Sequence, residues 1–353
     1  MANGDSGNSV AVIVVNYNGI RFLADCLDSV RGQTLRPSSV TIFDNGSTDG
    51  SAELVERDYP EVKLIRSSKN VGFATGNNRA IAPVLERGEA EYVFTLNNDV
   101  VLEPDCLERL VDTMVRGPRT LWSCQPKMYL SSKGSGEKIL NNAGIQVWLD
   151  GSAFNRGINQ VDRGQYDQRT EIFGTCAGAS LYRAAALREI GLFDGDFFAY
   201  LEDVDLAWRG RRAGYTSALC PRAVCHHHHG GTGGDPAAKI VRLERNRTWL
   251  LVKEYPLILV AASPLFTAYR FARISLSASR GAGKGSRIES YRGGMPASRL
   301  LAALARGLLA GARGIPASVR KRRAFANENI LGESEALRLV MEYSVPLCDA
   351  LDR

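Results

Sequence analysis

The sequence predicts an α/β fold, a Rossmann-like mixed sheet flanked by helices, and three observations support this prediction. Strand-like and helix-like segments alternate through the first part of the chain, which is typical of parallel strands with helices on both faces. Polar residues recur where the predicted strands end. The composition, 44% hydrophobic and 23% charged over 353 residues, is that of a globular protein able to bury a core.

Apolar, β-branched and aromatic runs define the strands, and apolar residues at helical spacing define the helices. In chain order the first segments are a strand at 10–18, a helix at 22–33, a strand at 39–47, a helix at 50–59, a strand at 62–67, a loop and helix at 70–87 and a strand at 92–96. Beyond residue 100 the pattern is looser. There we expect a hairpin at 141–157, a strand, Gly-rich turn and helix at 171–191, a loop and short helix at 193–215, and a strand ending in histidines at 217–231.

Polar side chains follow three of the predicted strands. Asn16 and Asn18 end the first strand, Asp44 and Asn45 end the second, and Asn97, Asn98 and Asp99 follow the strand YVFTL. In sheets of this kind ligands bind beyond the carboxyl ends of the strands. The three polar ends together therefore predict a ligand site at that edge.

Cysteine usage and the first residues predict an intracellular protein. The seven cysteines are scattered and form no CxxC pair, so we expect reduced thiols and no disulfide framework. The polar start, MANGDSGNS, leads directly into the first strand without the features of a signal peptide, and we expect residues 1–8 to be disordered.

Six motifs now occur in a characteristic order: VNYN, DNGSTDGS, KNVGFATGNN, LNND, EDVDLAWRGRRAGY and a late histidine. Together they resemble the family 2 glycosyltransferases of GT-A fold, and within them the bacterial rhamnosyltransferase-like branch. The resemblance covers roughly residues 9–250, which we take as the catalytic domain. It implies an inverting, metal-dependent enzyme that moves a sugar, L-rhamnose from dTDP-L-rhamnose, onto a lipid-linked or growing cell-surface polysaccharide. The alternative is a UDP-sugar donor with the same mechanism.

The resemblance also implies a divalent cation, Mg²⁺ or Mn²⁺, that neutralises the diphosphate leaving group. Asp99 matches the metal-binding acid of a D-x-D-like element, and Asn97 stands where the first acid is often found. A late histidine completes such sites. Strand alternation counted from Val224 favours His226, whereas the following glycines favour His227 or His228; a His-rich exposed loop is the alternative reading.

Asp44 resembles the acid that accepts a hydrogen bond from the pyrimidine N3–H of the donor, although its segment also reads as a turn and helix cap. The residues that the resemblance assigns to the donor nucleotide are Asn16, Asn18, Asp44, Asn45, Asn70, Gly72, Asn77 and Asn98.

Asp203 is the implied catalytic base, which removes the proton of the acceptor hydroxyl. Three acids within four residues raise the proton affinity of at least one of them. The alternative is an acidic helix N-terminus stabilised by the helix dipole. The residues that we assign to the acceptor and diphosphate are Glu202, Asp205, Arg209 and Gly178.

The C-terminal part is basic. Residues 239–325 hold 18 Lys and Arg against three Glu, in a chain whose net charge is +6. Arg299, Arg306 and Arg313 recur every seven residues and predict one stripe on a helix of about twenty residues, bounded by Gly293-Gly294, Pro296 and Pro316. We expect this region, 251–325, to attach the enzyme to an anionic membrane surface, and the alternative is a helix that packs on the protein itself or on a partner subunit.

The uncharged stretch 255–269 is too short to span a bilayer. The segment 326–353 returns to acidic and predicts a short terminal helix. We therefore expect a cytoplasmic enzyme, peripheral on the inner face of the membrane, and leave a homodimer open. Few aromatics accompany the basic residues, which disfavours a nucleic-acid-binding protein, and a non-catalytic membrane scaffold has only Asn97 in its favour.

Overall fold

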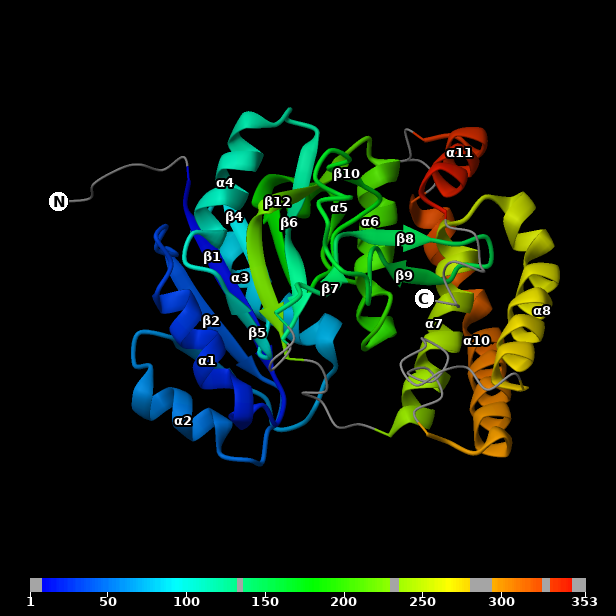
Figure 1. The fold of residues 1–353 in the computed structure, drawn as a ribbon, viewed down its shortest axis with the longest axis horizontal. Helices are drawn as coiled ribbons and strands as arrows, with labels where there is room; N and C mark the ends of the chain where they lie inside the picture. Colours follow the sequence, from blue (N-terminus) through cyan, green and yellow to red (C-terminus); the bar gives the residue numbers. More distant parts are fainter. Residues whose placement is uncertain (1–7, 132–135, 229–234, 280–293, 326–330, 345–353) are drawn as a thin grey trace. The chain divides into compact units, whose positions relative to one another are not determined.

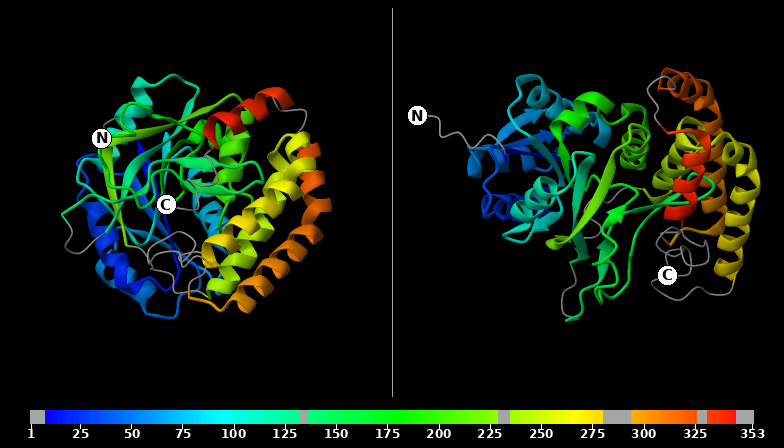
Figure 2. Two further views of the ribbon diagram at one scale, coloured as in Figure 1. Left: turned by 45° about the vertical axis from the view of Figure 1, so that its right-hand side comes forward. Right: turned by 90° about the horizontal axis from the view of Figure 1, so that it is seen from above.

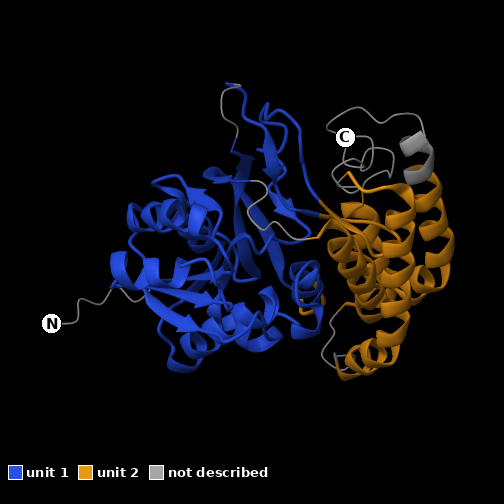
Figure 3. Cartoon of the chain, turned by 90° about the horizontal axis from the view of Figure 1, so that it is seen from below, with its two compact units in different colours: residues 1–145, 155–210, 215–233 blue, residues 146–154, 211–214, 234–353 orange. Residues whose placement is uncertain are grey.

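The computed structural model describes residues 8–131, 136–228, 235–279, 294–325 and 331–344. The chain divides into two compact units, coloured separately in Figure 3. The first comprises residues 1–145, 155–210 and 215–233, and the second 146–154, 211–214 and 234–353. The last segment of the first unit ends at residue 233, and residues 1–7 of the expected N-terminal segment lie outside the described part.

A ten-stranded mixed sheet forms the centre of the first unit (Figure 1). Its main order is β10-β12-β6-β11-β4-β1-β2-β3, while β5 pairs with β12 and β7 with β6. The strands are β1 (Val10–Asn16), β2 (Ser39–Asp44), β3 (Lys63–Arg66), β4 (Tyr92–Asn97), β5 (Val100–Leu102), β6 (Leu121–Leu130), β7 (Leu140–Asn142), β10 (Glu171–Ile172), β11 (Ala179–Arg183) and β12 (Thr216–His227).

The four strands β4, β1, β2 and β3 run parallel, as the alternation of elements predicted. Successive side chains of β1 point to opposite faces of the sheet. Val10, Val12 and Val14 join a core with α1 (Ile20–Arg31), α2 (Ser51–Asp58) and α4 (Cys106–Arg116), while Val15 packs against Gly76 of α3 (Phe73–Arg87). Helices therefore cover both faces.

α4 and β6 lie beyond residue 100, where the sequence pattern is looser, and neither was predicted. β6 reads LWSCQPKMYL, and the polar Gln125 and Lys127 and the intervening Pro126 interrupt its apolar run although all three are buried. β11 is antiparallel to both β4 and β6, so the sheet is mixed. The helices α5 (Ala184–Ile190) and α6 (Glu202–Arg212) and the short 3₁₀ turn η1 (Gly195–Phe197) complete this half of the chain.

The described residues of the second unit form a hairpin and four helices. β8 (Ile145–Val147) and β9 (Ala153–Asn155) form the hairpin expected at 141–157. The helices are α7 (Pro236–Glu254), α8 (Leu257–Ser279), α10 (Ala297–Phe325) and α11 (Glu333–Tyr343). The last of these agrees with the terminal helix that the sequence predicts.

Glycines let α10 approach α7 closely. A Cβ on Gly307 would lie 2.7 Å from the side chain of Glu244, and one on Gly311 would lie 2.7 Å from that of Thr248. Gly314 lies against the indole of Trp249. Trp249 also donates a hydrogen bond to the carbonyl oxygen of Gly311, at 3.0 Å. At these three positions, which we call the glycine seam, the two helices are so close that only glycine, which has no Cβ, fits.

The expected end of this helix at Pro316 is wrong, because α10 continues to Phe325. A proline inside a helix removes one hydrogen bond, and Pro316 lies on the exposed side. Within the described residues, Ala297–Ala324 is also the one helix whose length and apolar composition would suffice to cross a membrane. α10 packs on α7 along one side, and its arginines at 299, 306 and 313 are exposed.

Candidate functional site

Asn16 organises the polar groups at the carboxyl edge of the sheet. Its Nδ2 donates to Asp44 Oδ1 at 3.2 Å and to Ser51 Oγ at 2.8 Å, and its Oδ1 accepts from Asn98 Nδ2 at 2.7 Å. Asn16 is fully buried, and Asp44 nearly so. Because β1 lies between β2 and β4, one amide at its end can link both neighbours. The sequence prediction that these strand ends lie together is confirmed.

The turn after β2 is closed by the end of β1. The hydroxyl of Ser47 accepts the backbone N–H of Asn18, and Asn18 Oδ1 accepts the N–H of Thr48 at 2.8 Å. Asn18 has a φ of 50°, which asparagine tolerates better than most residues. Asp44 Oδ2 accepts from the N–H of Ser47 at 3.1 Å. Asp44 is therefore both a turn residue and a carboxylate held at the sheet edge, and the two readings of its segment are compatible.

The loop before α3 is held by hydrogen bonds among its own residues and Asn45. Asn45 donates to the carbonyl of Gly72 at 3.2 Å, and Asn70 accepts the N–H of Gly72 at 2.9 Å. Gly72 has a φ of +89°, and a Cβ there would lie 2.6 Å from the carbonyl oxygen of Phe198. Asn77 is buried and donates to Phe73 within α3. The close approach at Gly72 is thus to Phe198, and the Asn77 amide is occupied within its helix.

His227 is the histidine that meets Asp99. Its Nε2 lies 3.3 Å from Asp99 Oδ1, and its Nδ1 lies 3.2 Å from Asn141 Oδ1. Asp99 Oδ1 is buried and makes no hydrogen bond, since the contact with His227 is close but poorly aligned. A buried carboxylate oxygen without a hydrogen-bond partner beside an imidazole nitrogen is a donor pair suited to a divalent cation.

The structure does not bring the rings of His226 and His228, which the sequence analysis placed among the metal ligands, to the Asp99 carboxylate. His226 Nε2 lies 2.8 Å from Glu103 Oε1, and the His228 ring stacks on Phe22 with centroids 5.5 Å apart. Both histidines line a cavity of about 580 Å³ beside α1. His228 meets Asp99 only through its backbone N–H, which donates to the Asp99 carbonyl at 2.9 Å.

Asn97 and Gly178 connect the end of β4 with the turn that enters β11. The backbone N–H of Asn97 donates to the carbonyl of Gly178 at 2.8 Å. A Cβ on Gly178 would lie 3.1 Å from the side-chain amide nitrogen of Asn97. This arrangement follows from topology, because the amino end of the antiparallel β11 lies beside the carboxyl end of β4. Asn97 therefore faces the turn at 176–178.

Asp203 is oriented by the same turn. Its Oδ2 accepts the N–H of Ala177 at 3.3 Å, and its Oδ1 accepts the N–H of Val204 at 2.8 Å. Burial raises the pKa of Asp203, and the two backbone hydrogen bonds oppose this rise without cancelling it. A carboxyl group with a raised pKa at the edge of the sheet is suited to accept a proton.

Glu202, the neighbour of Asp203, is only 5% exposed. Its Oε2 has no hydrogen-bond partner. Burial, and then the charge of Asp203, raise the pKa of Glu202 to about 8. Burial is thus the larger cause of the raised pKa of Glu202, and the crowding of acids expected from the sequence is the smaller one.

The segment before these acids has an unusual backbone. Phe198, Tyr200 and Leu201 all have positive φ, at 64°, 74° and 67°. Bulky residues seldom adopt this conformation, and such strain is concentrated at functional sites. This segment leads directly into α6, whose first turn contains Glu202 and Asp203.

Asp205 and Arg209 have a structural role, which places them away from the acceptor and diphosphate function expected of them. Arg209 Nε lies 3.1 Å from Asp205 Oδ2, and its other nitrogens donate to the carbonyls of Ile190 and Leu192 at 2.5 and 2.6 Å. Both side chains are buried. They tie α6 to the end of α5.

Sequence reasoning missed two polar residues that support the site. Asn141 lies at Nδ1 of His227, and Gln125 accepts the N–H of Cys176 at 2.9 Å and so holds the turn that orients Asp203. Gln125 is fully buried in β6. A glutamine inside a strand that is otherwise buried was the available signal, because a buried amide needs hydrogen-bond partners.

The edge of the sheet thus carries, in the order β2, β1, β4 and β11, the carboxylate of Asp44, the amide of Asn16, the pair Asp99 and His227, and the turn that holds Asp203. No group of three or more His, Cys, Asp or Glu suited to a metal occurs among the residues that the structure describes. A cation here would take further ligands from a bound molecule, as Mg²⁺ sites commonly do with substrate phosphates.

Comparison with known proteins identifies the family of the chain. Residues 11–191 match the model of the family described as glycosyl transferase family 2. An N-acetylglucosaminyl-diphospho-decaprenol L-rhamnosyltransferase of Mycobacterium tuberculosis is 32% identical over 247 residues, which cover 65% of this chain and 79% of that protein. A poly-beta-1,6-N-acetyl-D-glucosamine synthase of Staphylococcus epidermidis is 22% identical over 61% of this chain and 49% of its own length.

A solved structure of GalNAc-T7 with UDP, GalNAc and Mn²⁺ has a similar fold, with a TM-score of 0.57 and 14% sequence identity. The similarity covers 81% of this chain and 54% of that chain, so this chain spans about half of the longer protein.

Proposed function

This chain belongs to glycosyl transferase family 2 and is a glycosyltransferase, and we propose that it transfers L-rhamnose from dTDP-L-rhamnose to an N-acetylglucosamine carried on a polyprenyl diphosphate. The sugar and the lipid-linked acceptor are those in the name of the mycobacterial relative. The observation that carries the proposal is the single sheet edge on which Asp44, the pair Asp99–His227 and Asp203 follow one another.

Asp44 receives the nucleotide base in this proposal. An ionised carboxylate only accepts hydrogen bonds, and the N3–H of thymine or uracil is a donor. Asn16 and the N–H of Ser47 hold Asp44 in place from one side. A pyrimidine diphosphate bound here would extend from β2 along the edge toward Asp99.

The diphosphate lies at Asp99 and His227. These two residues would hold Mg²⁺ or Mn²⁺, which would neutralise the charge that develops on the leaving diphosphate. The buried, unbonded Oδ1 of Asp99 supports this assignment. Asn141, by accepting from Nδ1–H of His227, leaves Nε2 unprotonated and facing Asp99.

Asp203 is the base. The acceptor hydroxyl oxygen attacks C1 of the sugar from the face opposite the diphosphate, a bond from that oxygen to C1 forms, and the bond from C1 to the diphosphate oxygen breaks with inversion. The hydroxyl proton passes to Asp203, whose oxygens are oriented by the N–H groups of Ala177 and Val204.

A panel of nucleoside diphosphates tests class and donor together. Thermal unfolding is measured with dTDP, UDP, GDP and ADP, each with and without Mn²⁺. The proposal expects a rise in Tm with dTDP that needs Mn²⁺, followed by transfer of labelled rhamnose to a lipid-linked N-acetylglucosamine. A larger effect of UDP would assign the alternative donor, and no effect of either pyrimidine nucleotide would refute the assignment of Asp44.

Membrane attachment at the inner face completes the proposal, since a polyprenyl-linked acceptor resides in the bilayer. Arg299, Arg306 and Arg313 are exposed on α10, in agreement with one basic stripe. Arg299 lies 3.0 Å from Asp235 in an exposed pair, which headgroup phosphates can replace.

A further inference from the structure

The outer face of α8 is apolar over its whole described length. Within Leu257–Arg273, the part of α8 whose side chains are described, every exposed residue is uncharged, and these residues recur three or four positions apart. They are Leu257, Ile258, Ala261, Pro264, Leu265, Ala268, Tyr269 and Ala272, which we call the α8 stripe. Leu265 is 76% exposed and Ile258 65%, values unusual for large aliphatic side chains on a helix.

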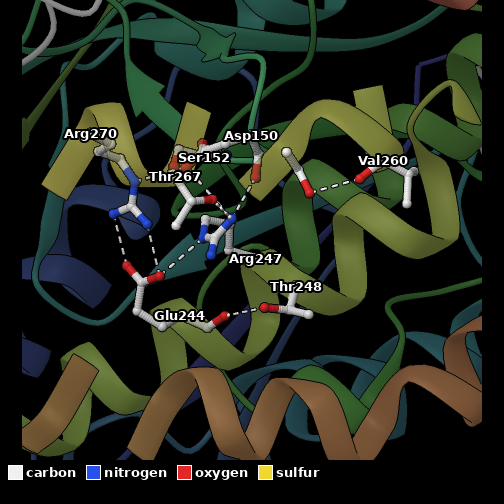
Figure 4. Close-up of polar contacts among 9 residues, drawn as sticks. Asp150, Ser152, Glu244, Arg247, Thr248, Val260, Thr267 and Arg270 are labelled. Atoms are coloured by element: carbon white, nitrogen blue, oxygen red, sulfur yellow. Dashed lines mark hydrogen bonds and ion pairs between the residues drawn. The ribbon is translucent and has the colours of Figure 1, made fainter. Parts of the chain in front are cut away.

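The charge that α8 carries at Arg270 is turned inward, as Figure 4 shows. Arg270 Nε donates to Asp150 at 2.8 Å, and its two terminal nitrogens donate to the two oxygens of Glu244 at 2.8 Å each. Arg247 contacts the same two acids, through Glu244 Oε2 at 3.0 Å and Asp150 Oδ2 at 3.6 Å. All four side chains are buried, so their charges balance inside the unit.

α10 adds cations and further aliphatic side chains. Figures 1 and 2 show α8 and α10 side by side in the second unit. α10 contains no acidic residue, and its exposed side includes Arg306 and Arg313 together with Leu301, which is 62% exposed, and Leu309, which is 54% exposed. Exposed arginines interleaved with exposed leucines are the pattern of a helix at a lipid–water interface.

We propose that the α8 stripe inserts among the acyl chains of an anionic bilayer while the arginines of α10 bind its headgroup phosphates. This inference rests on the membrane attachment proposed above and adds a second helix and a hydrophobic contact to it. A second copy of the chain fits this surface less well than lipid does. A symmetric dimer through it would bring the arginines of both copies together without acidic partners on α10.

Flotation with vesicles of phosphatidylcholine and phosphatidylglycerol tests the insertion. Leu265→Glu is compared with Val115→Glu, because Val115 is a 55% exposed aliphatic residue on α4 of the first unit. We expect Leu265→Glu to lower the partition coefficient by about tenfold or more, at low and at high salt. Val115→Glu should bind like the wild type. Arg306→Glu with Arg313→Glu should weaken binding chiefly at low salt.

A spectroscopic arm reports insertion directly. In Leu265→Trp, vesicles should shift the new tryptophan emission to the blue, and brominated lipids should quench it; in Val115→Trp neither should occur. Unquenched emission at position 265 overturns the proposal. So does a Leu265→Glu protein that floats normally but changes from dimer to monomer in sedimentation, since the stripe would then join two copies.

Failure of this inference can be told apart from failure of the proposed function. Leu265→Glu should transfer rhamnose to a water-soluble acceptor analogue at the wild-type rate, because it lies outside the sheet edge that carries the reaction. Retained transfer with lost flotation supports both proposals, whereas absent transfer in the wild type refutes the function and leaves the flotation result intact.

Discussion

His227 Nε2 lies 3.3 Å from Asp99 Oδ1, and this pair joins β12 to the carboxyl end of β4. Asn141 contacts the opposite ring nitrogen of His227. The histidine thus lies between an amide on one side and a carboxylate on the other, an arrangement suited to the metal-binding role proposed for it.

Replacing His227 should weaken metal binding, while replacing its neighbour should not. We expect His227→Ala to raise the Kd for Mn²⁺, measured by calorimetry with dTDP present, by about tenfold or more. His226→Ala is the matched control, because His226 contacts Glu103 and not Asp99. Equal losses in the two variants would contradict the assignment of His227.

Asn141→Leu should act through His227. The leucine has the same branched shape as asparagine but cannot accept the Nδ1–H, so the imidazole loses its orientation. We expect a rise in the Kd for Mn²⁺ of about tenfold, with a smaller effect for Asn141→Asp, which keeps an acceptor. A structural role alone would lower Tm in Asn141→Leu and leave the affinity for metal unchanged.

Asp203→Asn should remove the base and spare binding. The amide retains acceptor capacity at one atom only and takes no proton, so we expect kcat to fall about 10² to 10⁴-fold. The Kd for dTDP with Mn²⁺ should stay near the wild-type value. Asp196→Asn serves as the control, since Asp196 is exposed in the turn that precedes this segment. Wild-type turnover by Asp203→Asn would show that another group takes the proton.

Loss of the proton from the buried carboxyl group of Glu202 should make the fold less stable in alkali. Its pKa in the folded protein is about 8, above its ordinary value of 4.5. The stability that the bound proton confers is complete below pH 4.5 and declines as the pH rises to about 8. Urea unfolding at acid and alkaline pH should therefore show a fall in stability that Glu202→Gln, which has no proton to lose, reduces. An identical pH dependence in both proteins would contradict a protonated Glu202.

The glycine seam between α7 and α10 predicts a stability effect in the second unit. A side chain at Gly311 would collide with Thr248, and overpacking of this kind costs about 1–3 kcal/mol. We expect Gly311→Val to lower the midpoint of urea unfolding. Ala302→Val is the control, because Ala302 lies on the exposed side of the same helix. Similar midpoints for the two variants would argue against a close contact along this seam.

The positions of Asp44 and Asp99 at one edge were predictable, because parallel strands end on the same side of their sheet. The sequence did not identify the histidine that meets Asp99, because strand alternation counted from Val224 favoured His226. In the structure the fully buried face of β12 is that of Ala223 and Cys225, so His227 continues it.

Asn141 and Gln125 escaped prediction for a different reason. Each acts through a residue remote in sequence, His227 or Cys176, and only the folded chain brings them together. The extension of α10 through Pro316 was missed because an exposed proline can be accommodated within a helix that is packed elsewhere along its length.

The hydrogen bonds that orient Asp203 come from the main chain of Ala177 and Val204 and not from side chains. These two hydrogen bonds therefore do not depend on the chemistry of the side chains at 177 and 204, although both side chains are buried and so restricted in size, and neither residue can become proline. In the mechanism proposed above, residues that contact the acceptor could therefore change while Asp203 keeps its orientation.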